Sequence, residues 1–142
     1  MNTDASEANS GYLRSIVELE LEEITKEIIG AAFEVYNELG YGFLEKVYQR
    51  AMLVELEKRS VKVAAEAPIT VHYKGEIIGE YFADLFVNES VVVELKVAQK
   101  YNPNDEPQLL NELKATGISV GLLINFGKSK VEFKRFVRSQ KP

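Results

Sequence analysis

Two apolar segments, separated by a stretch with helical character, constrain the fold of this chain more than any other feature. Residues 120–126 are almost entirely apolar, as is typical of a strand covered on both faces. Residues 91–97 form a second predicted strand. A helix predicted over residues 105–115, ending at Gly117, connects the two. Because a crossover through a helix permits parallel pairing of strands, the sequence predicts an α/β protein.

The first part of the chain has the periodicity of two helices. Ser15 and Glu18 form a capping-box pattern, and apolar residues follow at helical spacing as far as Leu39. Gly40 then predicts a stop in the left-handed conformation. A second helix is predicted from about residue 42 to residue 59. Its apolar stripe would consist of Leu44, Val47, Tyr48, Ala51, Leu53 or Val54, and Leu56.

The pattern then changes to that of strands. A strand over residues 61–73 is broken near Pro68, and Lys74-Gly75 form the turn into a strand over residues 76–87. A final, more exposed strand is predicted over residues 130–138. The predicted fold is therefore a mixed β-sheet with a meander on one side and helices on its faces, in the order α-α-β-β-β-α-β-β.

The composition narrows the class of protein. With 142 residues the chain can bury a sizeable core, and we expect a disordered segment over residues 1–14 and a single domain over residues 15–142. The absence of cysteine excludes disulfides, thiolate metal sites and thiol nucleophiles. No apolar run is long enough to span a membrane and the first ten residues lack the pattern of a secretory signal, so we expect a cytoplasmic protein.

The charge of the chain is unevenly distributed. The net charge is −5, but residues 128–142 contain six lysines and arginines against one glutamate, a local net charge of +5. Such a basic end can hold the phosphate backbone of a nucleic acid near an acidic metal site. The alternative is a solvated edge strand whose basic residues prevent aggregation.

Carboxylates and a lysine occur inside otherwise apolar strands. Glu94 and Lys96 share a face of their predicted strand, while Leu95 points into the opposite layer. Asp84 lies ten positions before Glu94 in the neighbouring predicted strand. If these strands pair, the three polar side chains converge into a set suited to metal-dependent hydrolysis of phosphodiesters. The structural alternative is a Glu94–Lys96 ion pair at a strand end, with Asp84 starting a turn.

A set of short motifs also runs through the chain in a defined order. They are Gly42-x-x-Glu45-x-x-Tyr48, Tyr73-Lys74-Gly75, Ala83-Asp84-Leu85, Val93-Glu94-Leu95-Lys96, Gln108-Leu109-Leu110 and the segment from Gly121 to Gly127. Together they resemble the GxxExxY family of the PD-(D/E)XK nuclease superfamily over about residues 20–138. The resemblance implies a restriction-endonuclease-like core, arranged as helix, three strands, helix and strand.

The resemblance implies that Asp84, Glu94 and Lys96 are the signature residues of a nuclease site. Magnesium prefers oxygen ligands and commonly takes one or two protein carboxylates, so Asp84 and Glu94 would bind it together with the backbone carbonyl of Leu95. Glu45, an additional helical acid, would reach the metal through water or anchor a second ion. Lys96 would orient the nucleophilic water or stabilise charge on the phosphate.

Two further residues are candidates for contacts with the substrate. Gln108 falls in the first turn of the helix predicted over residues 105–115, and Tyr48 shares a helix face with Glu45. Each has a structural alternative, since Gln108 suits a surface, Tyr48 suits a core, and the helix dipole favours Glu45 in a first turn anyway. Members of the family tend to carry an aromatic residue where this chain has Glu112, which adds negative charge beside the substrate.

The expected function is therefore Mg²⁺-dependent hydrolysis of phosphodiester bonds in nucleic acid, with Mn²⁺ as an alternative metal. The sequence leaves open whether the nucleic acid is DNA or RNA. One alternative is a nucleic-acid- or protein-binding module that has kept the fold without turnover. Another is a structural subunit of a larger assembly, in which residues 120–126 with Phe133 and Phe136 support a homodimer.

Overall fold

The structure, a computed structural model, describes residues 2–138, and Met1 and residues 139–142 lie outside the described part. The helices of this part are α1 (Asn2–Leu39), α2 (Glu45–Lys58) and α3 (Glu106–Thr116), with a 3-10 turn over Pro103–Asp105 before α3. The strands are β1 (Val63–Ala65), β2 (Pro68–Tyr73), β3 (Glu76–Phe82), β4 (Leu85–Val87), β5 (Val91–Lys96), β6 (Val120–Phe126) and β7 (Val131–Val137).

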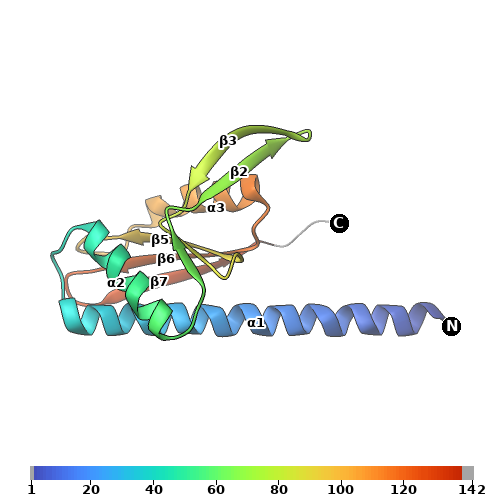
Figure 1. Cartoon of the computed structure of the whole chain (residues 1–142), viewed down its shortest axis with the longest axis horizontal. Coiled ribbons are helices and arrows are strands. Elements are labelled where there is room, and N and C mark those ends of the chain that lie inside the picture. Colours follow the sequence, from blue (N-terminus) through green and yellow to red (C-terminus); the bar gives the residue numbers. More distant parts are fainter. Residues whose placement is uncertain (1, 139–142) are drawn as a thin grey trace.

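Five strands form one mixed sheet in the order β1-β4-β5-β6-β7 (Figure 1). β4 pairs antiparallel with β5, β5 pairs parallel with β6, and β6 pairs antiparallel with β7. α3 provides the crossover between β5 and β6. The predicted α/β fold and the predicted order of its elements are confirmed, including the break near Pro68, which separates β1 from β2.

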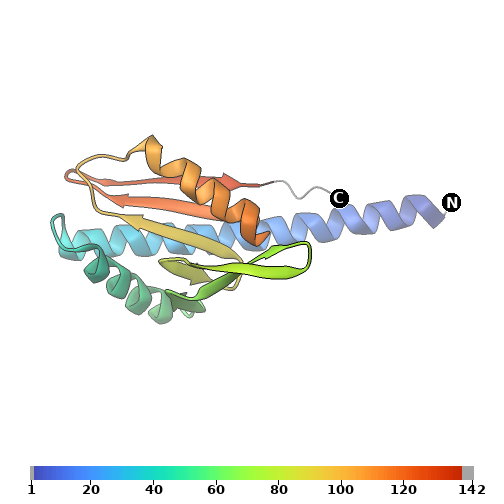
Figure 2. The same cartoon turned by 90° about the horizontal axis from the view of Figure 1, so that it is seen from above.

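Helices cover both faces of this sheet. α1 and α2 pack on one face, where they meet Val93 and Leu95 of β5. α3 packs on the other face, in a layer that includes Val92, and lies over the sheet in the view of Figure 2. Because successive strand residues point to opposite faces, Glu94 follows Val92 to the α3 face.

α1 is longer than predicted. The helix start predicted at Ser15 is wrong, because α1 begins at Asn2 and residues 2–14, expected to be disordered, are helical. No proline interrupts this stretch, and the Ser15 hydroxyl donates to the carbonyl of Gly11 within the helix instead of capping a new one. None of the helices in residues 2–138 combines the length and the apolar character that crossing a membrane requires.

Two glycines shape the turn between α1 and α2. Gly40 has φ +69° and its N–H donates to the Tyr36 carbonyl at 2.8 Å, so it ends α1 as predicted. Gly42 has φ +114°, a conformation that favours glycine although the space around it is open. α2 therefore starts at Glu45, three residues later than predicted.

The buried face of α2 differs in part from the predicted stripe. Tyr48, Met52 and Leu56 are buried at spacings of four residues. Leu44, a predicted member of the stripe, is 80% exposed because it precedes the helix as its N-cap residue. Met52 was not part of the predicted stripe.

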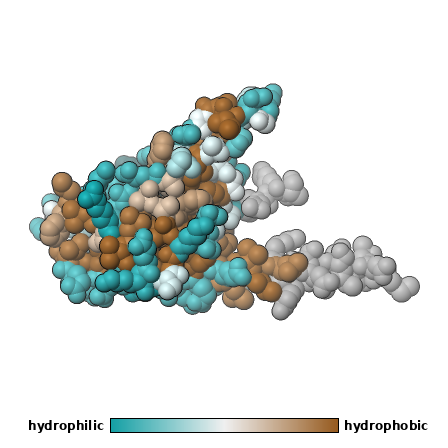
Figure 3. Space-filling view, in the orientation of Figure 1, coloured by the Kyte–Doolittle hydropathy of each residue, from teal (hydrophilic) through white to brown (hydrophobic). Residues whose placement is uncertain are grey.

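The predicted strand over residues 76–87 consists of two strands in different sheets. β3 pairs with β2 in a separate two-stranded hairpin, whereas β4 joins the main sheet, and Ala83 and Asp84 lie between them. The hairpin projects from the body of the protein (Figure 1) and carries an exposed apolar area that includes Ile77 and Ile78 (Figure 3). The break places Asp84 where the chain enters the main sheet.

Candidate functional site

Two of the predicted site residues lie opposite each other where β4 meets β5. Leu85 pairs with Val93, so the next position along places Asp84 opposite Glu94. The Asp84 N–H donates to Oε1 of Glu94 at 3.4 Å, and the Leu95 N–H donates to Oδ2 of Asp84 at 2.8 Å. The backbone of each strand thus holds the carboxylate of the other.

Gln49 of α2 fixes the same segment from a second direction. Its side chain is buried, with 6% of the residue exposed, and its Nε2 donates to the Asp84 carbonyl at 2.9 Å. Sequence reasoning missed Gln49 because the role of this side chain depends on which side of α2 faces the start of β4. A buried polar side chain on that side is the signal that identifies it.

Lys96 and Glu45 complete a group of charged side chains around Asp84. Lys96 follows Glu94 by two positions in β5 and shares its face, and Glu45 is the first residue of α2. Burial and the charge of Asp84 raise the pKa of the Glu45 carboxyl, while the Lys96 ammonium lowers it. The structure therefore brings these four predicted residues to one place.

Tyr81 of β3 is the direct partner of Glu94, to which its hydroxyl donates a hydrogen bond. Burial is the largest influence on Glu94 and raises its pKa to about 8, with the bond from Tyr81 opposing the rise and the charge of Asp84 adding to it. The pKa of the Tyr81 hydroxyl is itself raised by burial. Sequence reasoning missed Tyr81 because the break between β3 and β4, which brings it to Glu94, is not visible in the sequence pattern.

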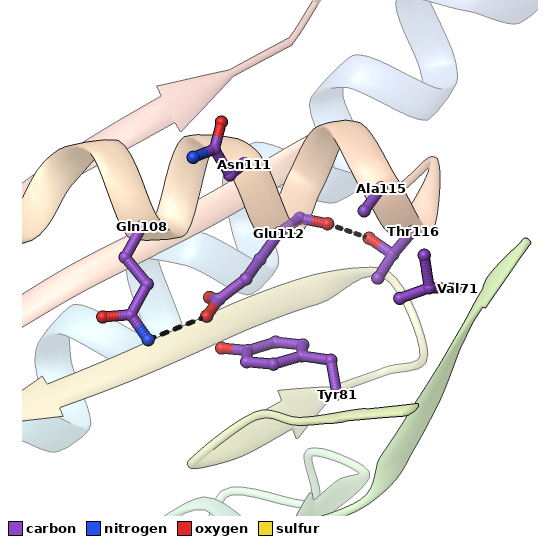
Figure 4. Close-up of a pocket in the computed structure, with 7 residues that line it drawn as sticks. All are labelled: Val71, Tyr81, Gln108, Asn111, Glu112, Ala115 and Thr116. Atoms are coloured by element: carbon purple, nitrogen blue, oxygen red, sulfur yellow. Dashed lines mark hydrogen bonds between the residues drawn. The ribbon is translucent and has the colours of Figure 1, made fainter. Parts of the chain in front are cut away.

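A pocket of about 510 Å³ lies beside these residues, between α3 and the hairpin of β2 and β3 (Figure 4). Its lining residues are Val71, Tyr81, Gln108, Asn111, Glu112, Ala115 and Thr116. Nε2 of Gln108 donates to Oε1 of Glu112 at 3.2 Å. Burial raises the pKa of Glu112, and Lys96 lowers it. Gln108 is thus joined to the charged side chains around Asp84 through Glu112, which the sequence predicted beside the substrate but not among the site residues.

Tyr48 lies away from any surface on which a substrate could bind. It is fully buried, its ring stacks on Phe126, and its hydroxyl donates to the Gly40 carbonyl at 2.6 Å. The substrate-binding role predicted for Tyr48 does not agree with this position. The alternative of a core tyrosine does, because the ring fills the layer between α2 and the sheet.

The arrangement of the carboxylates bears on which metal ion could bind. Within residues 2–138, no group of three or more histidine, cysteine, aspartate or glutamate side chains is arranged to hold a metal ion. The predicted set of Asp84, Glu94 and Glu45 therefore does not form such a group. Asp84 and Glu94 nevertheless offer adjacent carboxylate oxygens, next to the backbone of Leu95. Such hard donors fit a hard divalent cation, which commonly takes one or two protein carboxylates.

The family model of the PD-(D/E)XK nuclease superfamily matches residues 22–136. No curated protein matches the chain. Among solved structures, the crystal structure of SSO0001 aligns with a TM-score of 0.53 and 14% identity, covering 68% of this chain and 50% of that chain. An alkaline exonuclease (LHK-Exo) from Laribacter hongkongensis aligns with a TM-score of 0.41 and 11% identity, covering 66% of this chain and 56% of that chain.

This chain thus spans about half the length of these two solved chains. The likeness to SSO0001 concerns the fold alone. The family match is broader, because it extends from α1 to β7 and includes Asp84, Glu94 and Lys96. The protein belongs to the PD-(D/E)XK nuclease superfamily.

Proposed function

We propose that this protein is a Mg²⁺-dependent nuclease that hydrolyses phosphodiester bonds of nucleic acid, and that Mn²⁺ can replace Mg²⁺. The observation that carries the proposal is the position of Asp84 opposite Glu94, with Lys96 on the same face of β5. Membership of a nuclease superfamily supports this class of reaction. DNA and RNA are both compatible with these features.

Asp84 and Glu94 would hold the cation, together with the backbone carbonyl of Leu95. The N–H of Leu95 already faces Asp84, and the N–H and C=O groups of one strand residue face the same neighbouring strand. When bound, Mg²⁺ polarises the phosphate and lowers the pKa of a coordinated water. Two carboxylates suffice for an ion that keeps several waters, so Glu45 would act through one of those waters.

Lys96 would stabilise negative charge on the transferred phosphate. Its ammonium lowers the pKa of both Glu45 and Glu112, which lie in different helices. The ammonium therefore lies between α2 and α3, where a positive charge attracts a phosphate. To bind the cation, Glu94 would give up the hydrogen bond that it accepts from Tyr81.

We also assign the chain to the GxxExxY family within the superfamily. Gly42 adopts a backbone conformation that favours glycine, and Glu45 then begins α2 beside Asp84. The Tyr48 hydroxyl ties α2 to the Gly40 carbonyl. These contacts support the interpretation that the motif presents Glu45 to the site, with its tyrosine in a structural role.

A cleavage assay tests the proposal. Labelled single- and double-stranded DNA and RNA are incubated with the protein in EDTA, Mg²⁺ or Mn²⁺. We expect cleavage only with a metal ion. Asp84→Asn and Glu94→Gln should lose metal binding in calorimetry and reduce cleavage about 100-fold or more. Lys96→Ala should keep metal binding and lose cleavage.

The matched control is Glu57→Gln, which removes a carboxylate from the exposed part of α2. It should cleave like the wild type. Cleavage that survives in all three site variants would assign the activity to a contaminant or to another site. Circular dichroism of each variant confirms that the fold is retained.

The second candidate is a module that binds nucleic acid or protein without turnover. The bond from Tyr81 to Glu94 favours it, because it occupies a carboxylate that the reaction needs. The elevated pKa of Glu94 points in the same direction, since a carboxyl with a pKa of about 8 is mostly protonated at neutral pH. Binding of nucleic acid with no product after long incubation with Mg²⁺ would favour the module.

A further inference from the structure

We propose that the pocket between α3 and the β2–β3 hairpin receives one unstacked base of the nucleic acid, and that this base carries an exocyclic amino group. The inference rests on the proposed function, because it names the part of the substrate that would lie next to Asp84 and Glu94. It also predicts the strandedness of the substrate.

The pocket and the group of charged side chains around Asp84 have residues in common. Tyr81 lines the pocket and donates its hydroxyl to Glu94. Glu112 lines the pocket and interacts with the charges of Lys96 and Asp84. A nucleotide whose phosphate is held at Lys96 would therefore have its base next to the pocket.

The lining of the pocket suits a planar, neutral ring with polar edges. Tyr81 offers an aromatic ring for stacking, Val71 and Ala115 are apolar, and Gln108 presents its amide on the side of α3 that faces Tyr81 (Figure 4). The volume of about 510 Å³ lies in the range of small-molecule sites. None of the lining residues is basic, so the pocket favours a base over a phosphate.

An unsatisfied atom indicates the chemistry of the base. Oε1 of Glu112 accepts a hydrogen bond from Gln108, but Oε2 of Glu112 is buried and has no partner among the described residues. Nearly all buried polar atoms in proteins have one. The Tyr81 hydroxyl also lies within reach of Glu112, but it carries a single proton, and its hydrogen bond in the structure goes to Glu94.

An amino group of the substrate would satisfy this oxygen. Glutamate accepts from the N4 amino group of cytosine, and adenine and guanine carry amino groups as well, whereas thymine has none. A base inside a duplex is stacked and paired, so it must leave the helix to enter the pocket. We therefore expect a single-stranded substrate, or one with an unpaired base at the cleavage position.

The test is a binding measurement on the full chain without cleavage. Fluorescence anisotropy in EDTA compares labelled oligo-dC, oligo-dT and a duplex of the same length. Oligo-dC and oligo-dT differ little in ring size, so stacking contributes similarly to both. We expect oligo-dC to bind on the order of tenfold more tightly than oligo-dT, and the duplex to bind more weakly than oligo-dC.

Two variants assign the preference to the pocket. Ala115→Phe fills it and should weaken binding of oligo-dC on the order of tenfold. Leu110→Phe is the matched control, because Leu110 is exposed on the same helix and does not line the pocket. Glu112→Gln should bring oligo-dC and oligo-dT to similar affinities. Melting curves establish that each variant is folded.

Equal binding of oligo-dC and oligo-dT, unchanged binding in folded Ala115→Phe, or no binding of any oligonucleotide overturns the inference. These outcomes differ from a failure of the nuclease proposal. A preference for oligo-dC without metal-dependent cleavage contradicts the nuclease proposal alone. Cleavage that depends on Asp84, without a preference among bases, contradicts the base pocket alone.

Discussion

At the scale of single residues, the site depends on a carboxyl group that is difficult to ionise. Glu94 sits on the α3 face of β5, where burial is the main reason that its pKa rises from 4.5 to about 8. Between these two values the folded protein holds a proton at Glu94 that the unfolded chain has released. Folding therefore stabilises the protonated form, and the stability should decrease as the pH rises through this window.

Replacing Glu94 with glutamine removes this titration. In the wild type, the free energy of unfolding should fall between about pH 5 and about pH 8, and Glu94→Gln should reduce the fall by about 1–3 kcal/mol. Urea unfolding at the two pH values measures the difference. Glu57→Gln should follow the wild type. If the wild type and Glu94→Gln lose equal stability between these two pH values, Glu94 has its ordinary pKa in the folded protein.

The site residues that could be predicted from the sequence are those whose charge conflicts with the apolar residues around them. Asp84, Glu94 and Lys96 interrupt apolar stretches of the sequence, and that conflict is visible from local pattern alone. Tyr81 and Gln49 cause no such conflict, because a tyrosine suits a strand and a glutamine suits a helix. Their roles follow from contacts between separate elements, which local pattern does not contain.

At the scale of elements, the β5–α3–β6 crossover was predictable and the division of residues 76–87 was not. The apolar character of the two strands and the turn residues around α3 all favour the same arrangement. The division arises at Asp84. Its side chain accepts a hydrogen bond from the Leu95 N–H just beyond the β4–β5 ladder, and its backbone carbonyl accepts one from the Gln49 side chain. These are tertiary contacts, so an uninterrupted strand was the natural prediction from sequence.

Asn125 of β6 connects this strand to the segment that follows β5. It is 1% exposed and lies opposite Lys96 in the β5–β6 register. Its Oδ1 accepts from the Ala98 N–H at 2.9 Å, and its Nδ2 donates to the Ala98 carbonyl at 3.0 Å. This pair of bonds fixes the chain that leaves β5 immediately after Lys96.

Asn125→Ala should destabilise the protein by about 1–3 kcal/mol, because it removes two hydrogen bonds made by a buried side chain. Chemical denaturation measures the change. Asn37→Ala, on the exposed side of α1, should stay within about 0.5 kcal/mol of the wild type. A loss for Asn125→Ala as small as that of the control would mean that water replaces the missing partners.

At the scale of the whole molecule, the basic residues of β7 and those of the turn before it are placed in different ways. Lys134 forms an ion pair with Glu106 at 3.2 Å, and Arg135 donates to the hydroxyl of Thr25 at 3.3 Å. These two side chains hold β7 against α3 and α1. They are already engaged within the protein.

Lys128 and Lys130 are placed differently, in the exposed turn between β6 and β7. β5 and β6 are parallel, so this turn lies at the same edge of the sheet as Lys96. The Lys128 N–H donates to the Gln99 carbonyl at 3.1 Å, which attaches the turn to the chain that follows β5. We expect these two lysines to contact phosphates beside the site.

The double variant Lys128→Gln/Lys130→Gln should bind single-stranded oligonucleotides more weakly, and to a similar degree for every base, because phosphate contacts carry no base preference. The slope of log K against log salt should become shallower by about 1.4, since each phosphate contact to a single strand contributes about 0.7. Anisotropy titrations in EDTA at several salt concentrations measure it. Lys26→Gln/Lys58→Gln, with the same loss of charge on α1 and α2, should keep the wild-type slope. If both double variants keep that slope, Lys128 and Lys130 serve only to keep the β7 edge of the sheet solvated.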